Sequence, residues 1–124
     1  MPAYDSDRYS PGAAVATVGV RNLASGASVD EVRMVLDSGA DISALPKAVV
    51  DALTLAVGDR AYEVMAYDNT VRECRTVRAE VVFMRGHFKG QFIVLDQDDG
   101  VLGRNILNHL IVTLDGPRLE WEVR

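Results

Sequence analysis

The chain has 124 residues, of which 48% are hydrophobic and 25% are charged, and its formal net charge is −5. This length predicts one domain with a real core, and the balance of apolar and charged residues excludes a disordered chain. Because the chain is acidic and its 13 Lys and Arg residues are scattered singly, we expect neither nucleic acid nor a membrane as its partner.

The N-terminus and the rarer side chains narrow the class further. Residues 1–7 carry two acids and no apolar run, so they do not predict a signal peptide, and no segment reaches the ~18 apolar residues of a membrane span. Cys74 is the single cysteine, which excludes an intrachain disulfide and fits a reducing compartment. His87 and His109 have no partners at metal-ligand spacing. We therefore expect a cytoplasmic protein without a metal or a cofactor.

The hydrophobic pattern predicts many short strands and little helix. Residues 1–12 are polar and contain Pro and Gly, so we expect a flexible arm that precedes one domain over 13–124. Apolar runs bounded by turn residues predict strands at 13–20, 29–36, 61–67, 71–84, 92–95, 110–114 and 118–124. Short helices are expected at 46–53, with Val49 and Leu53 inward, and at about 104–108. This pattern indicates an all-β protein, either a barrel or a closed sandwich.

One stretch joins a buried strand to a polar turn. The apolar residues of 32–36 fall mainly on one face of a strand, which ends abruptly in Asp37-Ser38-Gly39. A strand of this kind would hold the Asp37 carboxylate rigidly at the rim of a core. Asp-Ser/Thr-Gly occurs by chance in roughly one chain in twenty of this length, so an ordinary turn is the alternative reading of the tripeptide alone.

A second stretch, Val101-Leu102-Gly103-Arg104-Asn105-Ile106-Leu107, has the same strand-turn-helix character, with Gly in place of Asp. In this order, the two stretches resemble the retroviral-type aspartic proteases, or retropepsins. That family has an apolar-apolar-Asp-Thr/Ser-Gly-Ala turn, and an apolar-apolar-Gly-Arg-Asn/Asp segment near the C-terminus. The resemblance covers about residues 29–114. It implies a small closed retropepsin-like barrel with one or two short helices and a β-hairpin flap.

The resemblance also implies a role for each matched residue. Asp37 is the catalytic acid, and Ser38, Gly39 and Ala40 complete its turn, with the Ser38 hydroxyl bonding across two subunits. The family pairs the carboxylate after the Ala with the Arg after the late Gly, so we expect an ion pair between Asp41 and Arg104. In the same position, Asp41 is also available to contact the substrate backbone. Leu102 and Gly103 form the second turn.

The hairpin over 62–77 occupies the place of the family's flap, the lid that closes over substrate. The expected tip residues are Tyr67, Asp68 and Asn69. Retroviral flaps carry glycines at the tip, and this sequence departs from that pattern. A plain structural hairpin is the alternative reading.

Hydrolysis of a peptide by this chemistry needs two carboxylates that share one proton. The chain has one Asp-Ser-Gly turn, so we expect a homodimer in which two copies of Asp37 face each other and act on a peptide or protein substrate. The alternatives are a catalytically inactive retropepsin-like module for dimerisation or peptide binding, and an unrelated small β-barrel. A nucleophilic Cys74–His pair lacks any recognisable surrounding motif.

Overall fold

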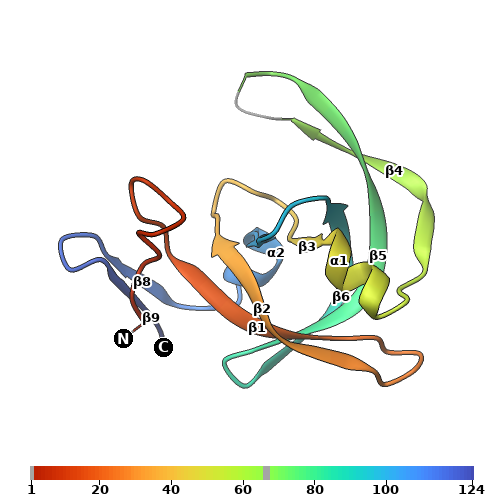
Figure 1. Cartoon of the computed structure of the whole chain (residues 1–124), viewed down its shortest axis with the longest axis horizontal. Coiled ribbons are helices and arrows are strands. Elements are labelled where there is room, and N and C mark those ends of the chain that lie inside the picture. The colour runs from red at the N-terminus through yellow and green to blue at the C-terminus, as the bar shows by residue number, and fades with distance from the viewer. Residues whose placement is uncertain (1, 66–67) are drawn as a thin grey trace.

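The computed structural model describes residues 2–65 and 68–124 (Figure 1). Within them, strands and helices follow one another in a single order: β1 (Val15–Arg21), β2 (Ser28–Leu36), β3 (Ala44–Pro46), α1 (Lys47–Ala52), β4 (Val57–Met65), β5 (Val71–Phe83), β6 (Gly86–Leu95), β7 (Gly100–Leu102), α2 (Arg104–Leu107), β8 (Val112–Asp115) and β9 (Glu120–Val123). No helix in the described residues is long and apolar enough to cross a membrane.

The main sheet has the strand order β1-β2-β7-β3-β6-β5-β4, and β1 also pairs with β5. That extra pairing closes six strands into a barrel and leaves β4 on its outside, hydrogen-bonded to β5. The prediction of a closed all-β barrel with two short helices is therefore confirmed. β4 and the first half of β5 rise away from the barrel as a long curved arm (Figure 1).

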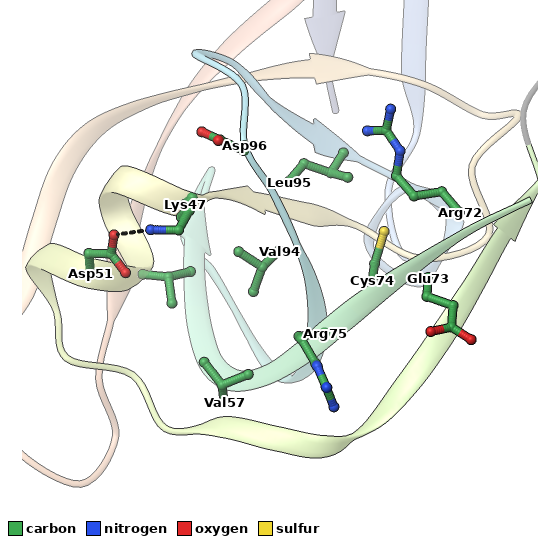
Figure 2. A pocket seen from close by; sticks show the side chains of 11 residues that line it. Lys47, Asp51, Val57, Arg72, Glu73, Cys74, Arg75, Val94, Leu95 and Asp96 are labelled. Carbon is green, nitrogen blue, oxygen red and sulfur yellow. Dashed lines mark hydrogen bonds and ion pairs between the residues drawn. The ribbon is translucent and has the colours of Figure 1, made fainter.

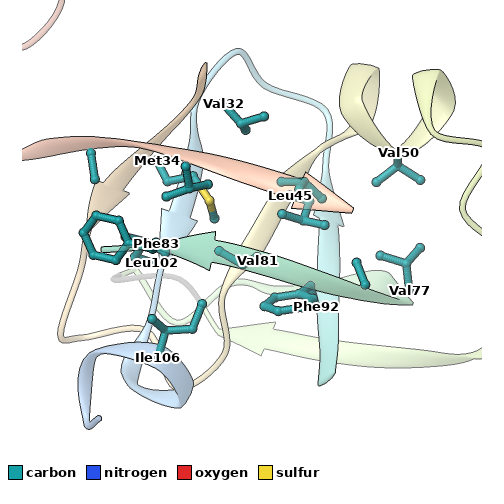
Figure 3. Close-up of a cluster of buried hydrophobic side chains, with 14 of the residues drawn as sticks. Val32, Met34, Leu45, Val50, Val77, Val81, Phe83, Phe92, Leu102 and Ile106 are labelled. Carbon is teal, nitrogen blue, oxygen red and sulfur yellow. The ribbon is translucent and has the colours of Figure 1, made fainter. Parts of the chain in front are cut away.

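Alternating side chains explain why the barrel has a filled interior. Val18 and Val20 of β1, and Val77, Val81 and Phe83 of β5, are buried, while their sequence neighbours mostly face outward. Figure 3 shows the side chains of Val77, Val81 and Phe83 converging with those of Phe92 and Leu102. The helices close the ends of this core, one through Val50 and the other through Ile106. In the first helix the buried valine is Val50; the expected Val49 is only half-buried, because the helix begins at Lys47 and its inner face is set by packing.

Three strands meet where the two predicted turns lie. β2 pairs in parallel with β7, and β7 pairs with β3. The strands approach so closely that a Cβ at Gly100 would lie 2.6 Å from the Ala44 carbonyl oxygen. β3 and β7 were not expected as separate strands, because each has three residues and carries too short a pattern to be read.

The two ends of the chain lie side by side (Figure 1). β8 and β9 form a two-stranded hairpin, and Ala3 bridges to Glu120 of β9. Asp5 bridges to Ala13, so the segment expected to be a flexible arm hydrogen-bonds to the domain at both of these points. The hairpin projects from the barrel on the side away from the β4–β5 arm (Figure 1).

Candidate active site

The turns after β2 and β7 are neighbours in space. Leu36 pairs with Leu102 in parallel register, and the Asp37 amide donates to the Leu102 carbonyl oxygen at 2.9 Å. The Arg104 amide donates back to the Ala40 carbonyl oxygen at 2.8 Å. The two similar stretches of sequence therefore form one structural unit, with the Asp turn and the Gly turn bonded to each other.

The carboxylate of Asp37 lies at the exposed surface of this unit. Its Oδ1 accepts the Gly39 amide at 2.9 Å, and its backbone carbonyl accepts the Ala40 amide at 3.2 Å. This is the local hydrogen bonding that favours Asp in turns. A rigid strand on one side and a bonded turn on the other hold an exposed acid in a fixed place.

Gly103 supports that acid from behind. It is buried, and a Cβ there would lie 2.8 Å from both the Ala40 carbonyl oxygen and the Ile42 carbonyl carbon. Its φ of −95° is open to any residue, so the requirement for glycine is one of space. The close approach of the two turns depends on the missing side chain.

A buried polar network, which the sequence analysis missed, ties the turns together. Ser43 is fully buried; its Oγ donates to Asn105 Oδ1 at 2.6 Å and accepts the Gly103 amide at 2.8 Å. The Ser43 amide also donates to Asn105 Oδ1, at 2.9 Å. Asn105 stands in the Gly-Arg-Asn segment that was singled out, but nothing local connects it to a serine 62 positions earlier.

Asp41 and Arg104 have other partners than the expected ones. Arg104 Nη1 donates to the Ser38 carbonyl oxygen at 2.8 Å, and the Tyr62 hydroxyl donates to Asp41 Oδ2 at 2.8 Å. The hydrogen bond to Asp41 raises the pKa of Tyr62. No salt bridge joins Asp41 to Arg104 in the described part of the chain. The β4 arm supplies the competing donor, and a backbone carbonyl takes the guanidinium.

A second polar cluster lies behind the same two strands. Arg33 of β2 donates from Nε to Asp99 Oδ1 at 3.0 Å and also bonds to Asp5, while the Tyr9 hydroxyl donates to Asp99 Oδ2 at 2.7 Å. Asp99 is buried, immediately before β7. We call Asp5, Tyr9, Arg33 and Asp99 the arm clamp, because it fastens the N-terminal arm to the strands that lead into both turns.

The arm clamp shifts the pKa values of its members. Burial alone would raise the pKa of Asp99, but the hydrogen bonds from Arg33 and Tyr9 outweigh it and the pKa lies below its ordinary value. Burial, with the bond to Asp99, raises the pKa of Tyr9 to about 12. Asp99 is thus held ionised and Tyr9 neutral, which is the state in which both hydrogen bonds form.

An apolar wall joins the arm to β3, β6 and β7. Ala44, Cys74 and Ile93 are its buried members. Partly buried side chains pack against them: Ile42, Tyr62, Val64, Leu95 and Val101. A cavity of about 350 Å³ shares Cys74 and Leu95 with this wall and is lined by residues of α1, β4, β5 and β6. Figure 2 shows Cys74 and Val94 among its lining side chains. No residue of the two turns lines that cavity, so it is separate from the Asp37 site.

The expected tip of the arm is partly described. Asp68 Oδ1 accepts both the amide and the hydroxyl of Thr70, at 3.1 and 2.6 Å, and Asn69 has a φ of 66°. These are the features of a tight turn that Asp and Asn allow. Tyr67 lies outside the described residues. Beside the tip, Met65 is 68% exposed and Val71 56% exposed, so apolar surface is available there for contact. Within 2–65 and 68–124 no cluster of three or more His, Cys, Asp or Glu could hold a metal ion.

The closed barrel and its paired turns define a retropepsin-like protein. Two solved structures share the fold. The EIAV protease in complex with the inhibitor HBY-793 is 22% identical, with a TM-score of 0.58, over 86% of this chain and 91% of that chain. A retropepsin-like aspartic protease from Rickettsia conorii is 19% identical, with a TM-score of 0.59, over 93% of this chain and 84% of that chain.

A family model described as aspartyl protease matches residues 22–106, which is more than half of the chain and includes both turns. The chain belongs to the aspartyl protease family, and the predicted retropepsin-like relationship is confirmed. No protein in a search of curated sequences matches it.

Proposed function

We propose that the protein is an aspartic endopeptidase whose active unit is a homodimer, with one Asp37 from each copy in the catalytic pair. The observation that carries this proposal is the Asp37 carboxylate itself. It is exposed, yet a buried strand, a bonded turn and the Gly103 turn fix it in place. Each chain supplies one such acid, and the reaction requires two.

The two carboxylates would divide the chemistry between them. Two carboxyl groups held close together resist being ionised at the same time, because their negative charges repel, so the pair shares one proton. The ionised member takes a proton from a water molecule, whose oxygen attacks the peptide carbonyl carbon, while the protonated member donates to the carbonyl oxygen. The resulting diol collapses as the amide nitrogen gains a proton and the C–N bond breaks. Because one shared proton is needed, the rate should be highest on the acid side of neutral pH.

The neighbouring residues have supporting roles in this proposal. Gly39 and Ala40 keep the turn narrow, so that a peptide backbone can approach, and Ser38 bonds across the subunits. Asp41 receives the substrate backbone next to the dyad. Arg104 fixes the turn through the Ser38 carbonyl oxygen, a contact of 2.8 Å that supports a positioning role.

The β4–β5 arm is proposed as the flap. Its Tyr62 already bonds to Asp41, which ties the base of the arm to the catalytic turn. The tip at Asp68 and Asn69 would then close over bound substrate and exclude water. The apolar wall beside Asp41 favours a substrate with an apolar side chain next to the cleaved bond.

The test is hydrolysis of a denatured protein at mildly acidic pH, with and without pepstatin. Asp37→Asn should reduce the rate by about a thousandfold or more, because the pair loses its base, and should leave dimerisation unchanged. Asp30→Asn makes the same change at an exposed position of β2 and should keep full activity. Equal cleavage by the wild-type and Asp37→Asn proteins would overturn the proposal. A dimer that binds peptide and cleaves nothing would favour the inactive module.

A further inference from the structure

The cavity beside the β4–β5 arm has no part in the proposed hydrolysis. Its lining comes from α1, β4, β5 and β6, so it lies where the base of the arm meets the barrel. Its volume of about 350 Å³ falls in the range of known ligand pockets, about 300 to 1,000 Å³. That space is enough for roughly ten water molecules or one small organic molecule.

Much of the lining is apolar. Val50 of α1 and Cys74 of β5 are 3% and 5% exposed, and Val94 and Leu95 of β6 extend the same surface. Val57 of β4, also in the lining, is 52% exposed, so apolar surface in this cavity remains available to a ligand. A concave apolar surface of this kind favours an apolar group over water.

Two opposite charges in the lining have no bonded partner. Arg72 lies on β5, and Asp96 directly follows β6. Among the described residues, neither side chain forms a hydrogen bond or an ion pair, with the other or with a third residue. In the view of Figure 2 they lie on the two sides of Leu95. A guanidinium and a carboxylate are thus both available beside the apolar surface.

The remaining charged residues of the lining are bonded or turned away. Lys47 donates to Asp51 Oδ2 at 2.7 Å, as the dashed line in Figure 2 marks. That bond raises the pKa of Lys47, and the nearby charge of Asp96 adds to the effect. Glu73 and Arg75 belong by alternation to the other face of β5, and Figure 2 shows their charged ends pointing away from the cavity.

We propose that this cavity binds a free α-amino acid with an apolar side chain. The carboxylate of the amino acid binds Arg72, its ammonium binds Asp96, and its side chain packs against Val94 and Leu95. A guanidinium donates two parallel hydrogen bonds to a carboxylate, and a carboxylate accepts hydrogen bonds from an ammonium. A ligand with one charge would leave Arg72 or Asp96 uncompensated, whereas an apolar amino acid carries both charges on one carbon.

The bound amino acid would join the arm to the barrel. Arg72 and Cys74 belong to the arm, whereas Val94 belongs to β6 and Val50 to α1. A ligand that contacts all of them holds the base of the arm in one position. Any effect of this on hydrolysis rests on the proposed function, but the binding itself does not.

Isothermal titration calorimetry with L-leucine tests the class of ligand. L-leucine should bind with a Kd of about 1 mM or lower. Isocaproate, which lacks the ammonium, and isoamylamine, which lacks the carboxylate, should each bind at least about tenfold more weakly. L-aspartate, which lacks the apolar side chain, should also bind at least about tenfold more weakly. No binding of L-leucine at about 10 mM, or equal binding of any of the three comparison compounds, would overturn the proposal.

Substitutions test the two charged contacts. Arg72→Gln and Asp96→Asn should each raise the Kd for L-leucine at least about tenfold. Arg78→Gln, at an exposed arginine of the same strand, and Asp98→Asn, at an exposed acid of the same loop, should leave the Kd unchanged. All four side chains are exposed, so the variants should fold like the wild type. Equal effects of the lining variants and their controls would contradict the proposed contacts.

Cys74 reports whether the cavity is occupied. It is the only cysteine of the chain and lies in the lining, so its reaction with the thiol reagent DTNB is specific to this place. Saturating L-leucine should slow that reaction at least about fivefold in the wild type, and much less in Arg72→Gln at the same concentration. Calorimetric binding without protection of Cys74 would place the amino acid elsewhere, and the proposal is then wrong.

These measurements are independent of catalysis. A protein that binds L-leucine in this cavity but hydrolyses no peptide supports the amino-acid site and removes the peptidase function. An active peptidase that does not bind L-leucine supports the peptidase function and removes the amino-acid site.

Discussion

The turns that begin at Asp37 and Gly103 follow neighbouring parallel strands and share a local shape, yet they are built for opposite purposes. Asp37 is exposed and presents a carboxylate, whereas Gly103 is buried and has no side chain to separate the two turns. The first turn supplies the carboxylate, and the second supplies the backbone against which the first turn packs. The Gly103 turn thus supports the Asp37 turn, and we expect it to tolerate fewer substitutions.

The contacts of the two turns repeat this contrast. Behind Asp37, the buried Ser43 bonds through its hydroxyl to Asn105 Oδ1 and to the Gly103 amide. In front, Tyr62 and Arg104 make single hydrogen bonds at the surface. Buried networks are costly to break, and exposed contacts are not. We therefore expect changes at the back to unfold the site, and changes at the front to alter activity with little effect on stability.

The largest effect is expected for Gly103→Ala. The new Cβ would lie 2.8 Å from backbone atoms of Ala40 and Ile42, which cannot move without separating the turns. We expect a loss of about 3 kcal/mol in the free energy of unfolding, measured with urea, together with loss of hydrolysis. Gly90→Ala is the matched control, because nothing lies within 4 Å of a Cβ there. Equal stability of the two variants would contradict the supporting role of the Gly103 turn.

Ser43→Ala comes next. It leaves the Gly103 amide and one Asn105 acceptor without their buried partner, which should cost about 2 kcal/mol in urea unfolding. Ser28→Ala, at an exposed position of β2, should change stability by less than about 0.5 kcal/mol. If activity falls in Ser43→Ala while stability is retained, Ser43 belongs to the chemistry and the division between the two turns is wrong.

The sequence was informative where a feature is local. Both turns could be recognised because each is encoded by a few consecutive residues. β1 and β5 could be recognised because apolar and polar residues alternate over many positions. β3 and β7 have three residues each, so periodicity had nothing to act on. The number of strands indicated a barrel or a closed sandwich, and the family resemblance implied the barrel, but its closure through β1 and β5 is visible only in the structure.

Partnerships across long stretches of chain could not be predicted. Ser43 with Asn105, and Arg33 with Asp99, are joined across more than 60 residues by strand pairing, which no local pattern encodes. The same limit explains Asp41, for which the family pattern suggests Arg104 but the structure provides Tyr62 from another strand. Composition predicted a flexible arm over 1–12. It could not show that Asp5 in this polar segment bonds to Arg33 on β2.

Asp99→Asn, in the arm clamp, should have a moderate effect that depends on pH. The pKa of Asp99 in the folded chain lies below its ordinary value of 3.8, so its contribution to stability is complete above that value and is lost as pH falls through the lower folded pKa. The variant should lose about 1–2 kcal/mol at neutral pH and show a flatter decline in thermal stability below about pH 4. Asp98→Asn is the exposed control. Identical acid profiles for wild type and Asp99→Asn would remove the clamp as a source of stability.

Gly39→Ala makes the same change in the exposed turn as Gly103→Ala makes in the buried one, and should have the smallest effect on stability. Its Cβ would lie 3.1 Å from Asp37 Oδ1, and that atom belongs to a side chain that can rotate. We expect the free energy of unfolding, measured with urea, to change by less than about 0.5 kcal/mol, because no buried atom is displaced. Hydrolysis should fall about tenfold, mainly in kcat, because the carboxylate leaves the position that its partner requires. A large loss of stability in Gly39→Ala, or none in Gly103→Ala, would contradict the view that the first turn presents the carboxylate and the second supports it.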